Sequence, residues 1–574
     1  MGYSQLYAEY LPEAFMCRLR AILALLDLLS SFDTSEQDRM TEEFKAFVKK
    51  FEAKVIPLHK QAALAYFSAT ISGKEEDYSR AADFEVQLTR VFASKEDFET
   101  LKRIREANTL ADPMLRRQLD VLYLSYLEKQ LEEDKLEEMI RLQNENEKKF
   151  SIFRAEVEGK KLTDNEIEEI LCCSTNSIEL EAAWIASKEI GSVVANDVLR
   201  LVRMRNEAAH ELGFANYHTM RLELGEQNST QIETLFDELD ELTAAAFAQL
   251  KSDMDAKLAE RYDVAVENLM PWHYQNRFFQ EAPKIYDIDL DVFYKDKDIV
   301  ALAKRYFAGL NMPIDDLVEH SDLFEKEGKY QHAYCTDIDR AGDVRVVCNI
   351  KPTYNWMDTT LHEYGHAVYD KFNDRSVPWV LREPAHTFTT EAIAMLFGRF
   401  ASNPGWLEQV AGVPAGKAQQ TADIMFQTLR LEQLVFSRWA QVMYRFEKAL
   451  YENPDQDLNS LWWQLVEKYQ LLRKPEGRDQ PDWASKIHVA LYPAYYHNYL
   501  MGELLASQLH AYICREILKS DNSCREAYVG RTEAGTWFID NIFKPGRTLL
   551  WNDMIENATG EKLTAKYYAA QFVS

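Results

Sequence analysis

The sequence predicts a mainly α-helical protein, and three observations support this prediction. Glycine and proline number only 20 and 16 among 574 residues, about 3% each, against the usual ~7% and ~5%. Several long stretches carry apolar residues at three- and four-residue spacing, which is the period of an amphipathic helix. The hydrophobic content of 47% and aromatic content of 12% are ample for a large core. Together these features argue against a many-stranded sandwich or barrel and against a disordered chain.

The clearest helical patterns follow one another along the first half of the chain. Residues 36–70 have the helical spacing, and residues 114–150 end in a charged run that we interpret as a solvated helix face. Thr163-Asp164-Asn165-Glu166 is typical of a helix start, with an N-cap residue and an acid in the first turn. Residues 229–260 predict one long amphipathic helix. No fixed-period repeat is present, which argues against a solenoid.

The N-terminal segment faintly resembles a signal peptide. Arg18 and Arg20 precede the apolar run 21–26, but Asp27 interrupts that run and no clean cleavage site follows. We therefore interpret it as an ordinary amphipathic helix. No run of 18 or more uncharged apolar residues occurs, so we expect no membrane span. We expect a cytoplasmic protein, the alternative being a secreted or periplasmic one whose signal peptide is not part of this chain.

One region is β-prone instead. Residues 334–336 and 344–350 flank the segment 339–343, whose composition is typical of a turn. We predict a short β-hairpin there. No Gly/Ser/Pro-rich linker divides the chain, so we expect residues 1–574 to form a single helical domain.

Charge and cysteine content limit the partners and the covalent chemistry. The chain has 66 basic and 93 acidic residues, a formal net charge of −27. Such a surface repels phosphate backbones and anionic membranes, so we expect a soluble protein with no nucleic-acid partner. Seven cysteines leave at least one free thiol. The pairs 335/348 and 514/524 could form disulfides in an oxidising compartment.

A candidate metal site follows the predicted hairpin, where residues 362–366 read HExxH. On a helix, His362 and His366 lie one turn apart on the same face, so both imidazoles can reach one cation. Glu363 projects about 100° away and can act as a general base beside the metal. Apolar neighbours indicate that this helix is buried, where histidines need partners. We therefore expect one zinc ion here rather than two histidines on a helix surface.

The third ligand has to come from further along the chain, where Glu383, His386 and Glu391 are candidates. Glu391 opens an apolar helical stretch in which a lone carboxylate would be costly, so we predict that it is the ligand. The alternative is that Glu391 is an acid in the first turn of a helix. Asp358, one turn before His362, could orient that histidine, but we favour a helix cap.

A second cluster occupies residues 486–499. Four tyrosines and two histidines lie within twelve residues here, and on a helix Tyr496 and Tyr499 share a face. A metallopeptidase needs a donor to the oxyanion of its tetrahedral intermediate, and a phenol or imidazole suits that task. The alternative is an aromatic stripe in the core.

These motifs together resemble the angiotensin-converting-enzyme family of zinc dipeptidyl carboxypeptidases, with a secondary likeness to the thimet/oligopeptidase F family. The likeness covers most of the chain, but residues 1–35 show no clear counterpart. Thr336 and Met395 depart from the family pattern, which has a histidine and an acid at these positions. Besides the hairpin, HExxH and the Glu391 segment, the stretches that carry the likeness are 184–191, 201–209, 212–214, 271–280, 307–310, 462–463, 468–470 and 486–488.

The resemblance implies a large, two-lobed helical ellipsoid with a deep central channel and a hairpin next to the zinc site. Helices within about residues 1–150 would form a lid, and residues 151–574 the catalytic core. It also implies roles for individual residues. The zinc ligands would be His362, His366 and Glu391, the base Glu363, the oxyanion donor Tyr499, the contact to the substrate backbone His488, and the groups that bind the substrate's C-terminal carboxylate Gln280, Lys486 and Tyr496.

We therefore expect a monomeric zinc metallopeptidase of the gluzincin type. It would release dipeptides from the C-termini of oligopeptides, using water activated by a glutamate base. The alternative enzyme is an endo-acting zinc oligopeptidase of the thimet/oligopeptidase F type. The alternative from another class is a peptide-binding protein with a dead site, but no ligand or base is missing from the motifs.

Overall fold

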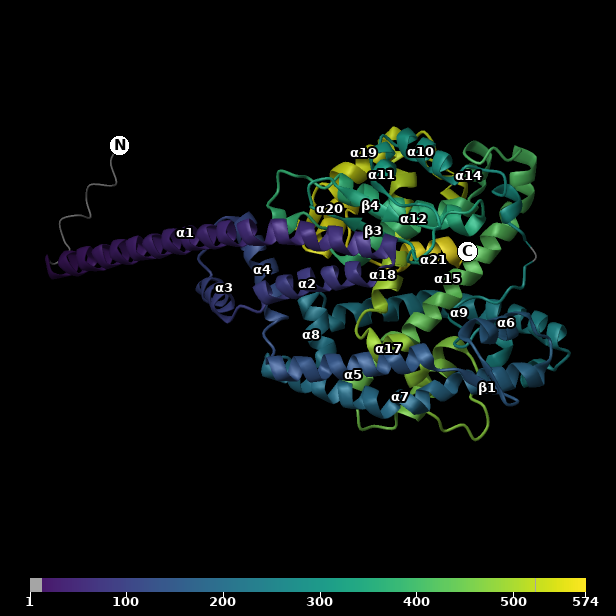
Figure 1. Cartoon of the computed structure of the whole chain (residues 1–574). Helices are drawn as coiled ribbons and strands as arrows, with labels where there is room; N and C mark the ends of the chain where they lie inside the picture. Colours follow the sequence, from purple (N-terminus) through teal and green to yellow (C-terminus); the bar gives the residue numbers. More distant parts are fainter. Residues whose placement is uncertain (1–12, 287, 522, 574) are drawn as a thin grey trace. The chain divides into compact units, whose positions relative to one another are not determined.

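The computed structural model describes residues 13–286, 288–521 and 523–573, with side chains described from residue 36 onward, residue 133 excepted. The described chain is mainly α-helical, as predicted, and Figure 1 shows its helices from α1 to α21. Its β-structure consists of two short antiparallel hairpins. Among the described helices, none is both long and apolar enough to cross a membrane.

The chain divides into two compact units. The smaller unit contains the chain up to Gln61 together with Asp83–Lys129, and the larger unit contains Ala62–Ala82 and Gln130–Ser574. Every residue predicted for the metal site and for the substrate lies in the larger unit.

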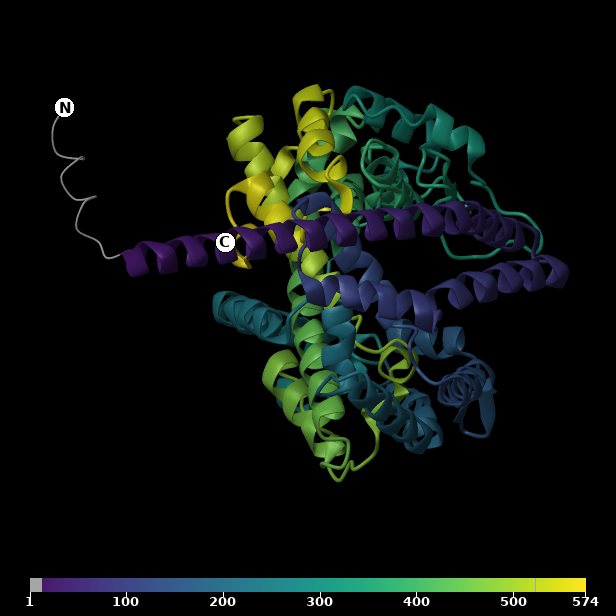
Figure 2. The ribbon, with the colours of Figure 1, turned by 90° about the vertical axis from the view of Figure 1, so that its left-hand side faces the viewer.

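The smaller unit is built from helices that pack through aromatic side chains. The N-terminal part of the long helix α1 (Glu13–Ser72), purple in Figure 2, contributes Phe47 and Phe51. Both rings contact Tyr126 near the end of α4 (Pro113–Leu127), at 6.1 and 6.3 Å between centroids. The helices α2 (Glu75–Phe92) and α3 (Lys95–Ala107) lie between them in sequence. The helices expected at 18–27 and 36–70 are both confirmed as parts of α1.

The larger unit holds the remaining elements. The helix predicted at 229–260 is confirmed as α9, and the stretch 114–150 forms two helices, α4 and α5. The helices of this unit, after the end of α1 and the start of α2, are α5 (Glu133–Ile152), α6 (Asp164–Cys173), α7 (Ser177–Glu211), α8 (Tyr217–Leu224), α9 (Ser229–Tyr262), α10 (Ile299–Gly309), α11 (Asp315–His320), α12 (Tyr354–Lys371), α13 (Thr387–Gly398), α14 (Pro404–Gln409), α15 (Ala415–Glu452), α16 (Leu458–Leu465), α17 (Ile487–Leu491), α18 (His497–Tyr512), α19 (Thr532–Phe538), α20 (Trp551–Thr559) and α21 (Lys566–Phe572).

Local chemistry explains several element boundaries. Thr163 caps α6 as predicted: its hydroxyl accepts the N–H of Glu166 at 3.3 Å, and Glu166 accepts the N–H of Thr163 at 2.7 Å. The predicted hairpin is confirmed as β3 (Tyr334–Asp337) paired with β4 (Val344–Val347). A second hairpin, β1 (Ala155–Val157) with β2 (Lys160–Leu162), was not predicted. Its turn is Glu158-Gly159, and both residues have positive φ. Of the two, only the glycine is a residue type that signals such a turn in a sequence.

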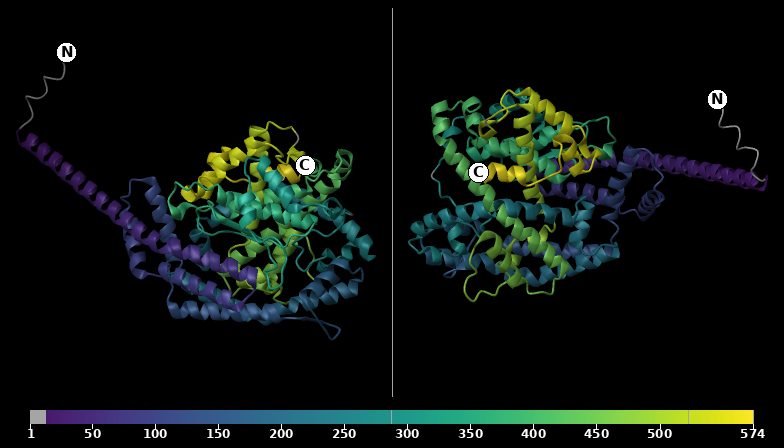
Figure 3. Two further views of the ribbon diagram at one scale, coloured as in Figure 1. Left: turned by 45° about the horizontal axis from the view of Figure 1, so that its top comes forward. Right: turned by 180° about the vertical axis from the view of Figure 1, so that it is seen from behind.

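The core of the larger unit centres on α12, α13 and α18. The middle helix, α13, packs on both of the others, and α18 also contacts α20 and α21, which are yellow in Figure 3. The α12–α13 contact is close because Gly365 has no side chain. A Cβ added at Gly365 would lie 2.8 Å from the Cα of Ala394, well inside normal contact distance.

We predict that Gly365→Ala destabilises the larger unit, because the added methyl group forces α12 and α13 apart. Overpacking of this kind costs about 1–3 kcal/mol, which would appear as a lower midpoint of thermal or urea unfolding. The matched control is Gly416→Ala in the first turn of α15, where nothing lies within 4 Å of the added Cβ. That change should be neutral or stabilising by up to about 1 kcal/mol. Equal midpoints for the two variants would show that the helix crossing does not need a glycine.

Candidate metal centre and active site

The HExxH residues lie on α12, whose start is set by Thr353. The Thr353 hydroxyl accepts the N–H of Trp356 at 3.3 Å, so the helix begins at Tyr354. The prediction that Asp358 caps this helix is therefore wrong, because the helix starts one turn earlier. Asp358 instead occupies the second turn, on the same face as His362.

Three predicted ligands meet where α12 crosses α13. One donor atom from each of His362, His366 and Glu391 lies within 4.8 Å of the others. Glu391 Oε2 is 3.7 Å from His362 Nε2 and 3.9 Å from His366 Nε2. The other two candidates have different roles: Glu383 pairs with Arg340, and His386 caps α13 by accepting the N–H of Phe388.

The chemistry of this cluster fits a zinc ion. Burial lowers the pKa of His362 to about 4. Burial, together with the nearby His362, lowers the pKa of His366 to about 3. Both imidazoles are therefore neutral and can act as ligands. His366 Nδ1 forms a 2.7 Å hydrogen bond with the Thr390 hydroxyl. A neutral ring that donates from Nδ1 keeps the Nε2 lone pair for a metal. Burial also raises the pKa of Glu391 to about 7, a cost that a dication would offset.

Glu363 lies beside the cluster without joining it. It is only 7% exposed, and burial together with the nearby Glu391 raises its pKa to about 8. Glu363 and the three clustered residues border one cavity of about 580 Å³. The other residues that line this cavity are Ala333, Tyr334, Cys335, Asp370, Pro384, Thr390, Met395 and Tyr499.

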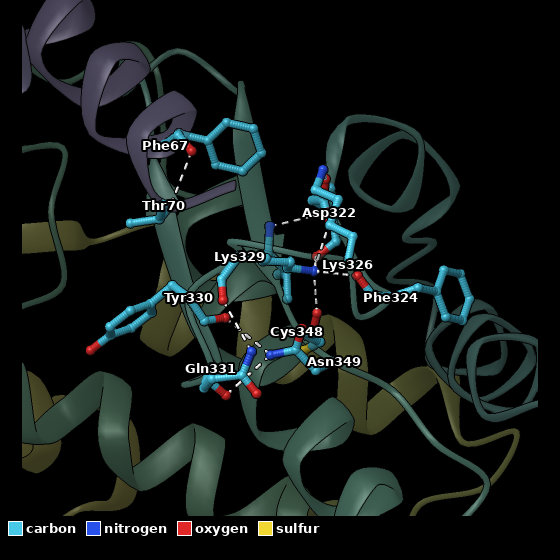
Figure 4. A network of polar contacts seen from close by, with 12 residues as sticks. Phe67, Thr70, Asp322, Phe324, Lys326, Lys329, Tyr330, Gln331, Cys348 and Asn349 are labelled. Atoms are coloured by element: carbon cyan, nitrogen blue, oxygen red, sulfur yellow. Dashed lines mark hydrogen bonds and ion pairs between the residues drawn. The ribbon is translucent and has the colours of Figure 1, made fainter. Parts of the chain in front are cut away.

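The hairpin wall of this cavity is held by a buried lysine (Figure 4). The Lys329 ammonium donates to the carbonyls of Asp322 at 2.9 Å, Phe324 at 2.8 Å and Cys348, and it pairs with the Asp322 carboxylate at 2.7 Å. The Asn349 side chain donates to the carbonyls of residues 330 and 331, each at 3.1 Å. These bonds tie the segment before β3 to the end of β4. Cys335 and Cys348 are free thiols here, as are Cys514 and Cys524.

Tyr499, in the first turn of α18, connects the cavity to the rest of the tyrosine cluster. Its ring centroid lies 5.3 Å from that of Tyr495 and 5.4 Å from that of Tyr496. The ring of Tyr496 in turn lies 4.9 Å from that of His488. His488 is not among the residues that line the 580 Å³ cavity, and its Nδ1 has no hydrogen-bond partner within the described residues.

The structure also brings together the three residues predicted to bind a carboxylate. The Lys486 ammonium donates to Gln280 Oε1 and lies 5.6 Å from the ring centroid of Tyr496. The Tyr496 hydroxyl accepts a hydrogen bond from Trp439 Nε1 at 2.8 Å. Burial lowers the pKa of Lys486 to about 8, with the nearby Glu281 opposing that shift. The predictions did not include Thr390, Trp439 or Glu281, which no short motif marks.

Comparisons with known proteins show which family the chain resembles. A family model described as angiotensin-converting enzyme matches residues 38–275 and 280–572. The chain is 22% identical over 425 residues to angiotensin-converting enzyme of Mesocricetus auratus, covering 69% of this chain and 32% of that protein. It is 24% identical over 261 residues to carboxypeptidase 1 of Bacillus subtilis, covering 41% and 50%. It is also 23% identical over 311 residues to an inactive angiotensin-converting enzyme-related protein of Caenorhabditis elegans, covering 50% and 33%. The match thus spans about a third of the length of the hamster relative.

We predict that Thr390→Val weakens zinc binding about 10- to 100-fold, the usual effect of removing a partner that orients a ligand. The reason is the lost hydrogen bond to His366 Nδ1. Competition with a chromophoric chelator measures the zinc dissociation constant. Thr390→Ser keeps the hydroxyl and should retain most of the affinity. If the valine and serine variants bind zinc equally well, the hydroxyl does not orient His366.

Proposed function

The chain belongs to the angiotensin-converting enzyme family of peptidases, and from this premise we propose that it is a zinc-dependent peptidyl-dipeptidase that acts on oligopeptides. The observation that carries the proposal is that two sites lie close together in the structure. A three-residue metal cluster with an adjacent glutamate lies near a buried lysine–glutamine–tyrosine group. The first suits peptide hydrolysis, and the second suits recognition of a free C-terminus.

His362, His366 and Glu391 would hold the zinc. When bound, zinc supplies a Lewis acid that polarises the scissile carbonyl. Glu363 borders the same cavity, so its carboxylate would take a proton from the attacking water and pass it to the leaving amine. The Tyr499 hydroxyl, on the opposite helix α18, would donate a hydrogen bond to the oxyanion as it forms.

The exo mode of action would come from Lys486, Gln280 and Tyr496. Lys486 and Tyr496 are each only 7% exposed. Within the described residues, Lys486 makes one hydrogen bond, to Gln280, and the O–H of Tyr496 has no acceptor. A substrate carboxylate would use these spare donors. Its fixed position would then decide which peptide bond lies at the cluster, because the rings of Tyr496 and Tyr499 connect the two sites.

The test compares one peptide as the free acid and as the C-terminal amide, with products identified by mass spectrometry. We expect C-terminal dipeptides from the free acid and at least about tenfold slower cleavage of the amide, since a charged hydrogen-bonded contact is lost. Lys486→Ala should raise KM for the free acid and reduce this difference. Equal cleavage of both peptides by the wild type would favour the endo-acting oligopeptidase instead.

We predict that Glu363→Gln lowers kcat by more than about 10²-fold, the usual effect of losing a general base, while zinc stays bound. The amide keeps the size of the side chain but cannot accept the proton. Activity and zinc content by elemental analysis are measured on the same samples. Near-wild-type turnover would show that Glu363 is not the general base, and loss of zinc would show that it is a metal ligand. If this protein were inactive, like the relative from Caenorhabditis elegans, its wild type would show no zinc-dependent cleavage.

A further inference from the structure

Exposed aromatic rings gather beside the hairpin that borders the metal cavity. Tyr66 in α1 and Tyr330 before β3 are 47% and 40% exposed. Their ring centroids lie 5.8 and 6.4 Å from that of Tyr334 in β3. We call Tyr66, Tyr330 and Tyr334 the tyrosine platform. Single exposed rings are common on protein surfaces, but rings that gather in one patch mark a binding surface.

Hydrogen bonds between the end of α1 and the hairpin hold the platform in place. The Thr70 hydroxyl donates to the Phe67 carbonyl at 2.9 Å (Figure 4), so it accepts from the Tyr334 hydroxyl. The Tyr330 N–H donates to the Thr70 carbonyl at 2.8 Å. All of these residues belong to the larger unit. The rings are therefore positioned before a ligand arrives, which lowers the entropic cost of binding it.

The platform is continuous with the metal cavity. Tyr334 lines the 580 Å³ cavity together with the three predicted zinc ligands and Tyr499. From Tyr499, a ring contact with Tyr496 leads to the group proposed to bind the substrate's C-terminal carboxylate. From Tyr334, ring contacts lead instead to the exposed Tyr66 and Tyr330. A peptide whose C-terminus is held beyond Tyr499 therefore reaches the platform with residues on the N-terminal side of the scissile bond.

The spacing of the rings suits an extended peptide. Centroid separations of 5.8 and 6.4 Å match about two residues of a strand, which advances ~3.3 Å per residue. Side chains on one face of such a peptide would thus meet successive rings. Aromatic side chains are the most favourable partners, because rings attract one another in offset and edge-on arrangements. A second copy of the chain is disfavoured as the occupant, because each copy carries a net charge of −27.

We propose that the tyrosine platform binds an aromatic side chain of the substrate, on the N-terminal side of the scissile bond and outside the metal cavity. This inference rests on the proposed dipeptidase function. The platform adds affinity without touching the reacting atoms, so it lowers KM rather than raising kcat. The enzyme therefore prefers oligopeptides that carry phenylalanine, tyrosine or tryptophan upstream over shorter peptides that end inside the cavity.

The experiment uses the zinc-loaded full chain and pairs of free-acid oligopeptides that differ at one upstream residue, phenylalanine or alanine. The varied position moves away from the scissile bond from pair to pair. Release of the C-terminal dipeptide gives kcat and KM for each peptide. At the position that reaches the platform, we expect phenylalanine to be preferred by at least about threefold in kcat/KM, through KM, as for an aromatic pair. Tyr66→Ala and Tyr330→Ala should each reduce this preference, whereas Tyr330→Phe keeps the ring and should retain it.

The matched control is Phe324→Ala. Phe324 is 61% exposed and precedes β3 as Tyr330 does, but the two rings lie on opposite sides of Lys329 (Figure 4). Its preference for phenylalanine should equal that of the wild type.

Equal kcat/KM for phenylalanine and alanine at every position in the wild type would overturn the platform while leaving the dipeptidase function intact. If the wild type also formed a dimer that Tyr66→Ala abolishes, the platform would belong to a contact between two copies of the chain. No dipeptide release from any peptide would overturn the proposed function and this inference with it. The wild-type comparison decides the matter even if the tyrosine variants fail to fold.

Discussion

The candidate site depends on how closely three helices can approach one another. The helix that carries Glu391, α13, lies between α12 and α18, and each neighbour meets it at a glycine. A Cβ on Gly365 would come within 2.8 Å of Ala394 Cα, and a Cβ on Gly502 within 3.5 Å of both Ala392 N and Glu391 Cβ. Because the backbones pack directly, the side chains next to these glycines converge. His366 follows Gly365, and Tyr499 lies one turn before Gly502, so both are directed toward Glu391.

Two acids in this cavity, Glu391 and Glu363, share one physical consequence of burial. Glu391 and Glu363 lie close together in a desolvated place, and the pKa of each is raised. A protein interior holds acids like these only at a cost unless a cation compensates them. For Glu391 and Glu363 that cation would be a metal ion.

The tyrosine and tryptophan side chains give the site its rigidity. The ring of Tyr496 contacts the rings of Tyr499 and His488, and Trp439 on α15 donates a hydrogen bond to the Tyr496 hydroxyl. Aromatic side chains have few rotatable bonds, so such a stack fixes positions at low entropic cost. The separation between the metal cluster and the carboxylate-binding group would therefore be set by packing rather than by flexible loops. This is the condition that a dipeptide-length product requires.

The sequence by itself determined the mainly helical fold, the β3–β4 hairpin, the cap of α6 and the pairing of His362 with His366. These features depend on side-chain periodicity and capping within a few residues, which can be read locally. The choice of Glu391 over Glu383 and His386 also came from local composition, through the cost of a lone acid in an apolar helix. Only the tertiary structure decided what joins distant segments. It placed Thr390 against His366 and Trp439 against Tyr496, and it showed that Asp358 is not a cap. Contacts between residues tens to hundreds of positions apart follow from helix packing, which no short motif encodes.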